Sequence, residues 1–427
     1  MFRIKQIINI PAKDGFARIM LMSLLFTFLV LYLYVSNKII WVIYLLYLVL
    51  IIGARMKLTL KPIIIPLLVS APLLWSLLMS YNSDLYHFSQ GFFYLSIPLI
   101  LILTGYQMSR IFTPEKYFSA IATMGILIAL LFIIVTIIKV GFIAFASPYT
   151  EARFVVSGGS VLASGSPVCI LSLVAAAYSE QFDIKIFKKP VARYLTILVN
   201  LTAIYLFASR TYWVLLFIFV IVFSFKTMRK DKLLFFGFLL VAAILILTAI
   251  INSKTGLNFQ NSIFYKLVNS FKEIKVSDIS NSENINTYYR GYEAYRSWIT
   301  FTEGNLPQKI FGFGYGKLVN LDARVLLAGK YWTAVPWVHN GFFFILVKEG
   351  FLGVVFVLLF FYYLSSTSIK GFKADLPERQ FLRLVLLSCT ISMFITNYIV
   401  CGMFSHEMAI LMITIGFLFA RLSMTTI

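Results

Sequence analysis

Long apolar runs alternate with short polar segments along almost the whole chain. Runs of a length suited to crossing a bilayer fall at 17–35, 39–54, 62–80, 91–108, 117–139, 161–179, 194–208, 211–225, 233–252, 340–364, 382–400 and 407–422. A helix of about 20 apolar residues crosses the roughly 30 Å hydrocarbon core, whereas a membrane barrel needs shorter, alternating segments. The pattern predicts an all-α polytopic membrane protein with about 12 transmembrane helices.

Composition supports this class and charge predicts its orientation. Hydrophobic residues make up 60% of the chain and charged residues 13%, too few charges to cover a soluble domain. Most of the 37 lysines and arginines fall in segments that share one side if both termini are cytoplasmic. This positive-inside pattern accounts for the net charge of +20 without nucleic acid as a partner. We expect a single transmembrane domain over 1–427, N-in and C-in, with a large, partly helical outer loop at 253–339 between helices 9 and 10.

One apolar run, 194–225, contains an arginine. As a single helix it would extend about 48 Å, and both of its flanks are basic, so a hairpin with Arg210 at the outer tip fits better. Each leg would be about 22 Å long, which sets Arg210 below the membrane surface. Such a charge either pairs with a carboxylate such as Glu407, or snorkels, or binds an anion through its fork of donors.

The outer loop contains a second candidate for anion binding. The segment 286–301, "NTYYRGYEAYRSWITF", predicts a helix in which Glu293 lies three residues from both Arg290 and Arg296. Tyr288, Tyr292 and Tyr295 would share one face of it. One interpretation is an amphipathic helix resting on the membrane; the other combines arginines for a diphosphate with aromatic rings for sugars.

Two further motifs stand at the end of the loop. The segment 311–316, "FGFGYG", includes Gly314 and indicates backbone that approaches a ligand or a neighbouring helix closely. His339 and Asn340 directly precede the tenth apolar run. His339 is a candidate general base, since imidazole exchanges protons near neutral pH, or else a helix-capping or interfacial residue. Deeper in that run, Lys348 and Glu349 are interpreted as a neutralised pair, and no metal-ligand cluster is apparent.

The order of these features resembles the O-antigen ligase/polymerase superfamily of membrane glycosyltransferases. The pattern is "ASRT" at a hairpin tip, an arginine-bearing loop helix, "FGFGYG" and then "VHNGFFFILVKEGFLG". The resemblance implies a C-type glycosyltransferase-like fold in the bacterial inner membrane, with a periplasmic active site and neither metal nor cofactor. It implies that Arg210 and Arg290 hold the donor diphosphate and that His339 is catalytic. Tyr288, Tyr292, Arg296, Asn340 and Gly314 are expected to help bind the substrate.

The resemblance leaves the acceptor open. A polymerase transfers the growing glycan from undecaprenyl diphosphate to the next lipid-linked repeat unit, whereas a ligase transfers it to lipid A-core and a third group to protein. The "FGFGYG" motif resembles polymerases more closely, and a chain-length regulator is then a further partner. A lipid-linked oligosaccharide flippase is the alternative from another class. It is disfavoured because the polar features crowd into the second half of the chain rather than repeating in both.

Overall fold

The computed structural model describes residues 64–146, 166–207, 209–227, 273–278, 288–327 and 330–423, and isolated positions 42, 45, 46, 48, 49, 52 and 285. The spans predicted at 17–35 and 233–252, and most of 39–54, lie outside these residues. The other nine predicted spans each coincide with a helix. Their bounds are α3 (Ile64–Met79), α4 (Leu85–Met108), α5 (Pro114–Val140), α8 (Ser166–Tyr178), α9 (Pro190–Phe207), α10 (Arg210–Thr227), α16 (Gly341–Ile369), α17 (Pro377–Val400) and α18 (Ala409–Ser423).

The chain is mostly helical, with several helices able to cross a membrane. Among the residues that the structure describes, six helices are long and apolar enough by length and composition: α4, α5, α9, α16, α17 and the segment His406–Ser423 that contains α18. Three shorter apolar helices, Ile64–Met79, Pro167–Phe182 and Arg210–Ser224, accompany them. These helices make the chain a multi-pass membrane protein; the twelve spans and their orientation remain predictions.

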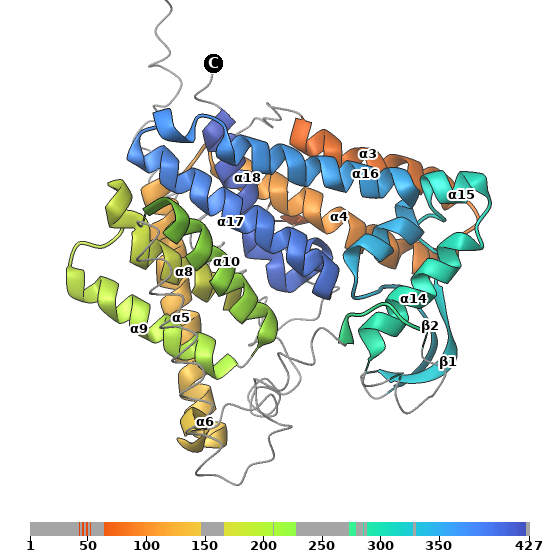
Figure 1. The fold of residues 1–427 in the computed structure, drawn as a ribbon, viewed down its shortest axis with the longest axis horizontal. Helices are drawn as coiled ribbons and strands as arrows, with labels where there is room; N and C mark the ends of the chain where they lie inside the picture. The colour runs from red at the N-terminus through yellow and green to blue at the C-terminus, as the bar shows by residue number, and fades with distance from the viewer. Residues whose placement is uncertain are drawn as a thin grey trace, which may run out of the picture.

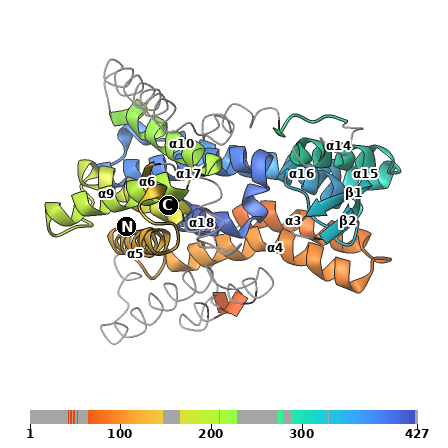
Figure 2. The ribbon, with the colours of Figure 1, turned by 90° about the horizontal axis from the view of Figure 1, so that it is seen from below.

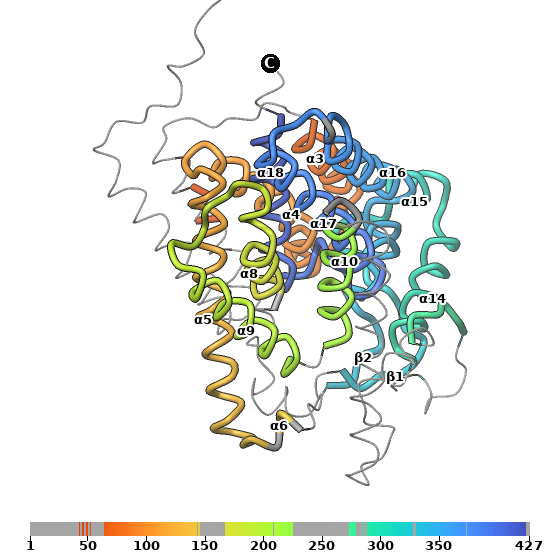
Figure 3. The backbone as a smooth tube through the Cα atoms, turned by 60° about the vertical axis from the view of Figure 1, so that its left-hand side comes forward, coloured from red at the N-terminus to blue at the C-terminus, as the bar shows by residue number. Residues whose placement is uncertain are grey.

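The helices pack in two groups. One group contains α5, α8, α9 and α10, and the other contains α3, α4, α16, α17 and α18, with α10 against α17 joining the two. In the turned views α10 still lies beside α17, the contact that joins the two groups (Figures 2 and 3). The short helices α14 (Tyr289–Thr302) and α15 (Leu306–Phe311) gather with a hairpin at the first turns of α16 (Figure 1). The short helix α6 (Ile143–Ala146) follows α5.

The run containing Arg210 is divided as predicted, since α9 ends at Phe207 and α10 begins at Arg210. Both legs pack against α8. Each leg has 18 residues and is therefore about 27 Å long, more than the sequence suggested, because α9 begins at Pro190 and α10 continues to Thr227. Arg210 is the first residue of α10, at the tip between the legs.

A two-stranded antiparallel hairpin departs from the all-α prediction. Strand β1 (Val319–Leu327) pairs with β2 (Lys330–Val335), and the register shifts between Asn320 and Val325. Asp322, at this irregularity, has a positive φ of 54°. In β1 the apolar residues Val319, Leu321 and Val325 are buried, the alternation by which one face of a strand packs inward.

Candidate active site

His339 is held by a buried carboxylate from another part of the loop. Oε2 of Glu293, on α14, accepts a hydrogen bond from the His339 backbone amide at 2.6 Å and lies 2.9 Å from Nδ1 of the ring. A carboxylate in this position accepts a hydrogen bond from Nδ1–H, which favours the tautomer with a lone pair on Nε2. The His339 side chain is 28% exposed, whereas that of Glu293 is 1% exposed. The imidazole is therefore reachable, while the residue that orients it is not.

The second oxygen of Glu293 is also occupied. The Tyr289 hydroxyl donates to Oε1 of Glu293 at 2.9 Å. Burial, followed by the charge of the adjacent Glu293 carboxylate, raises the pKa of the Tyr289 hydroxyl, which keeps it protonated and a donor at neutral pH. With both oxygens engaged, Glu293 presents a fixed acceptor to His339.

Aromatic rings enclose the His339 imidazole. The Trp337 ring centroid lies 4.6 Å away, and the Tyr289 ring meets the imidazole edge-on at 5.8 Å. Tyr94 of α4 in turn stacks on Trp337 at 6.3 Å. These contacts restrict rotation of the ring, so that the position of Nε2 is set by packing as well as by hydrogen bonding.

Asn340 caps the helix that follows. Its Oδ1 accepts hydrogen bonds from the amides of Phe342 (3.0 Å) and Phe343 (3.2 Å), two of the unpaired donors at the start of α16. Asn340 is 6% exposed. Asn340 therefore caps the helix, whereas the His339 ring takes no part in capping and bonds Glu293 instead.

Arg210 holds a carboxylate through both arms of its fork. Nη1 and Nη2 of Arg210 donate to Oε1 and Oε2 of Glu273 at 3.0 and 2.9 Å. Both side chains are about one-quarter exposed, at 26% and 24%. The backbone of Glu273 and Lys275 packs against Gly291 of α14, where an added Cβ would lie 2.1 Å from the Lys275 carbonyl oxygen. Arg210 thus has a carboxylate partner, as one interpretation of the sequence expected, but that partner is Glu273.

Glu407, the partner that the sequence suggested for Arg210, bonds elsewhere. Its Oε2 accepts a hydrogen bond from the Tyr212 hydroxyl at 3.1 Å. Tyr212 is two residues along α10 from Arg210, and Glu407 lies in the short 3-10 helix His406–Met408 that precedes α18. This bond ties the tip of the hairpin to the end of the bundle that carries His339.

Arg290 is a second arginine beside Arg210. Together with Glu273, Glu293 and His339 these two arginines form the active-site cluster. Burial lowers its pKa, and the charge of Arg210 lowers it further, against the opposing charges of Glu273, Glu293 and Glu407. The Arg290 guanidinium forms no hydrogen bond or ion pair with the residues that the structure describes. Arg290 is therefore a half-buried cation, close to both Arg210 and the Glu293–His339 pair, with its donors available.

Arg296 and Tyr292, two further predicted site residues of α14, bind the hairpin of β1 and β2. Arg296 donates from Nε to the Asn320 carbonyl at 3.0 Å and pairs with Asp322 at 3.5 Å. Tyr292, 4% exposed, donates its hydroxyl to the Leu321 carbonyl. The helix expected from the spacing of Glu293 to Arg290 and Arg296 is present, but the Glu293 carboxylate is turned inward to His339 and forms an ion pair with neither arginine among the described residues. Tyr288 is half-buried immediately before α14; its role and that of Tyr292 toward substrate stay predictions.

The "FGFGYG" segment is a packed turn against two helices. The amide of Gly314 donates to the Lys348 carbonyl at 3.1 Å, and the amide of Tyr315 to Oγ of Ser80 at 2.7 Å. Gly314 has φ +82°, and a Cβ there would lie 2.5 Å from that same oxygen. The glycines therefore allow a close approach to neighbouring helices, which was one of the two expectations. Substrate binding at Gly314 stays a prediction.

Lys348 and Glu349 do not neutralise each other. Nζ of Lys348 donates to the carbonyls of Tyr315, at 2.7 Å, and Lys317. The ion pairs of the described residues include none between Lys348 and Glu349. Gly350, at φ 73°, interrupts α16 directly after them. Lys348 thus anchors the glycine turn, which corrects the neutralised pair expected from the sequence.

Within the described part of the chain, no group of three or more His, Cys, Asp or Glu side chains is arranged as metal ligands. No known protein family and no curated protein sequence matches the chain. What the site offers is an accessible histidine held by a buried glutamate, together with two arginines close by.

Two residues of the cluster had no predicted site role. Glu293 was visible only as a helical neighbour of the arginines, and Glu273 lies in a loop segment without a motif. Their partners are 46 and 63 residues away in sequence. Only the short spacing from Arg290 to Glu293, less than one helical turn, hinted that Glu293 belongs to this site.

Proposed function

We propose that this chain is a membrane glycosyltransferase that polymerises oligosaccharide repeat units carried on undecaprenyl diphosphate. The observation that supports it best is the Glu293–His339 pair, with Nδ1 2.9 Å from the carboxylate, in one cluster with Arg210 and Arg290. A base fixed by a buried carboxylate suits proton removal from a sugar hydroxyl, and paired guanidiniums suit a diphosphate leaving group. No other protein component is needed for these two steps.

In the proposed reaction His339 acts as general base. The acceptor hydroxyl gives its proton to Nε2 as its oxygen forms a bond to the anomeric carbon of the donor. The bond between that carbon and the diphosphate oxygen breaks, and undecaprenyl diphosphate departs with the electron pair. Glu293 stabilises the resulting imidazolium and holds it in position, a role that in comparable pairs is worth several orders of magnitude in rate.

Arg290 and Arg210 bind the donor diphosphate in this scheme. Arg290 has free donors, whereas the fork of Arg210 is filled by Glu273 through the two contacts of 3.0 and 2.9 Å. A phosphate group presents two oxygens at a spacing similar to that of a carboxylate, so donor binding would replace Glu273 at Arg210. Negative charge that grows on the leaving diphosphate is then stabilised by both guanidiniums.

The proposal includes the membrane arrangement predicted from charge. Twelve spans with both termini in the cytoplasm would put the start of α16, and with it His339, at the periplasmic face of a bacterial inner membrane. The lipid-linked donor would then enter sideways from the bilayer toward Arg210. The acceptor sugar would approach from the periplasm under α14 and the hairpin.

Glycolipid analysis of a deletion strain tests the proposal. The strain is complemented with the wild-type gene or with His339→Ala, and the products are separated on a gel. Core carrying one repeat without a ladder, restored only by the wild type, supports a polymerase. Bare core with polymer accumulating on undecaprenyl diphosphate indicates the ligase, and repeats trapped on the cytoplasmic side indicate the flippase. Unchanged glycolipids in the deletion strain would refute all three.

A further inference from the structure

A second arginine cluster lies at the opposite end of the bundle from His339. Arg110 follows α4, Arg379 and Arg383 lie in the first turns of α17, and Arg421 lies in the last turn of α18. Helix α17 is 24 residues long, so this end is about 36 Å from the end that leads to Glu407 and the active-site cluster.

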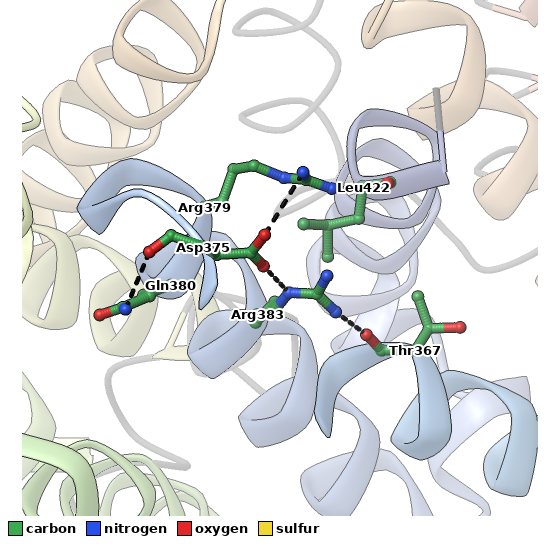
Figure 4. A network of polar contacts seen from close by, with 6 residues as sticks. All are labelled: Thr367, Asp375, Arg379, Gln380, Arg383 and Leu422. Carbon is green, nitrogen blue, oxygen red and sulfur yellow. Dashed lines mark hydrogen bonds and ion pairs between the residues drawn. The ribbon is translucent and has the colours of Figure 1, made fainter. Parts of the chain in front are cut away.

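Contacts between helix ends draw these arginines together. Arg421 donates from Nη2 to the Phe112 carbonyl, two residues from Arg110, and it lies within electrostatic reach of Arg110. Arg379 donates from Nη2 to the Leu422 carbonyl at 3.2 Å, directly beside Arg421. Figure 4 shows the guanidinium of Arg379 near Leu422. Arg421 is therefore close to Arg110, and Arg379 bonds the backbone at the end of the helix that carries Arg421, so the three arginines gather where three helix ends meet.

Carboxylates are scarce in this cluster. Asp375 pairs with both Arg379, at 3.3 Å, and Arg383, as the dashed lines in Figure 4 show. Arg110 and Arg421 form no ion pair with a carboxylate among the described residues. The charge of Glu378 also reaches Arg421, so two carboxylates, Asp375 and Glu378, stand against four arginines and the cluster keeps a net positive charge.

Their hydrogen bonding is also incomplete. The Nε atoms of Arg110, Arg379 and Arg421 are buried and have no acceptor. Arg193 near the same end is different: its Nε donates to the Ala176 carbonyl at 2.7 Å, and its other nitrogens reach Ala177 and Glu180. Because a buried donor without an acceptor destabilises the fold, three such groups in one cluster point to an absent acceptor.

We propose that Arg110, Arg379 and Arg421 form a binding site for the phosphate of an anionic phospholipid in the leaflet on that side of the membrane. Phosphate oxygens match the guanidinium fork and would supply the acceptor that the Nε atoms of these three arginines lack. Leu376, beside Asp375, is 73% exposed, and Ile369 is 61% exposed. These apolar surfaces beside the charges fit acyl chains, which favours a lipid over free phosphate.

Native mass spectrometry of the full-length protein in detergent tests the site, with phosphatidylglycerol and phosphatidylcholine added in equal amounts. The wild type is expected to retain phosphatidylglycerol preferentially. Each arginine near an anionic headgroup contributes about a factor of five, so Arg110→Ala with Arg421→Ala should lower that retention roughly thirtyfold. Arg193→Ala, whose donors are all satisfied internally, is the matched control and should retain the lipid as the wild type does.

A second experiment uses only the wild-type protein, so it does not require that the variants fold. It distinguishes a lipid headgroup from free phosphate as the ligand. The thermal stability of delipidated wild type is measured with phosphatidylglycerol and with inorganic phosphate. Stabilisation by the lipid at far lower concentration supports the lipid site; equal stabilisation by inorganic phosphate would support the phosphate site but move its source to solution. Equal retention of both lipids by the wild type, with stabilisation by neither ligand, would overturn the proposal. An equal loss of phosphatidylglycerol in Arg193→Ala would overturn it as well.

Discussion

Oε2 of Glu293 bonds both the backbone amide and the ring Nδ1 of His339, at 2.6 and 2.9 Å, so one buried oxygen fixes the position and the orientation of the imidazole. The residue that orients His339 is therefore a glutamate of α14. Because Asn340 caps α16, helix capping does not account for His339, which leaves the proposed catalytic role to be tested.

The first prediction concerns this pair. Glu293→Gln should reduce turnover by about 10²–10⁴-fold, because an amide no longer selects the tautomer with a free Nε2 or stabilises the imidazolium. His339→Ala should lose at least as much, and the double variant should lose little more, since the two act as a unit. Purified enzyme with its lipid-linked donor provides the measurement, and Glu303→Gln at the end of the same helix is the control. Full activity in folded Glu293→Gln would contradict the assignment.

The second prediction concerns the two arginines. Arg210→Lys and Arg290→Lys should each lower kcat/KM by about 10²–10³-fold, because an ammonium keeps the charge but lacks the fork that binds two phosphate oxygens. Arg324→Lys on the exposed side of β1 should be silent. Initial rates across a range of donor concentrations give kcat/KM for the wild type and for each variant. If lysine substitutes fully at both positions, charge alone is sufficient and the bidentate model fails.

The third prediction isolates Glu273. Glu273→Gln should lower the KM for the donor several-fold, because the internal carboxylate no longer competes with phosphate for Arg210. The salt bridge is partly exposed, so the folded protein should lose little stability, on the order of 1 kcal/mol or less. Binding of undecaprenyl diphosphate, measured without turnover, gives the same comparison. A weaker donor affinity in Glu273→Gln would show instead that Glu273 holds Arg210 in its productive position.

The fourth prediction tests the interrupted helix α16. Gly350 has φ 73°, and a Cβ there would lie 2.4 Å from the Gly312 nitrogen, so Gly350→Ala should destabilise the fold by about 2–5 kcal/mol. Gly141 has φ +81° with nothing within 4 Å, so Gly141→Ala should cost only the conformational strain of about 1–2 kcal/mol. Thermal unfolding in detergent compares them. Equal melting temperatures of Gly350→Ala and Gly141→Ala would contradict the prediction. They would show that the segment around Gly312 can move away from the added methyl group.

The fifth prediction concerns orientation. The native cysteines Cys169, Cys389 and Cys401 are fully buried, so they leave a low background for thiol labelling. In intact spheroplasts Lys330→Cys, on the hairpin, should react with an impermeant reagent, whereas Lys370→Cys, after α16, should react only after lysis. The reverse pattern would invert the proposed topology.

The sequence by itself determined the features that depend on local composition. Apolar runs predicted helices α3 to α5, α8 to α10 and α16 to α18, because a long run has to satisfy its own backbone within the bilayer. It also predicted the break before Arg210 and the helix containing Arg290, and it correctly marked the start of α16 near His339. Each of these features depends on residues that are close together in the sequence.

The tertiary structure alone decided which charges meet. Glu293 could have paired with either arginine one turn away, but packing turns it inward to His339. Arg210 pairs with Glu273 rather than with Glu407. Lys348 donates to backbone carbonyls of the glycine turn rather than pairing with Glu349. Each choice depends on how segments that are distant in the sequence pack against one another. Periodicity and composition do not encode such pairings, because the residues involved are brought together only when the helices assemble.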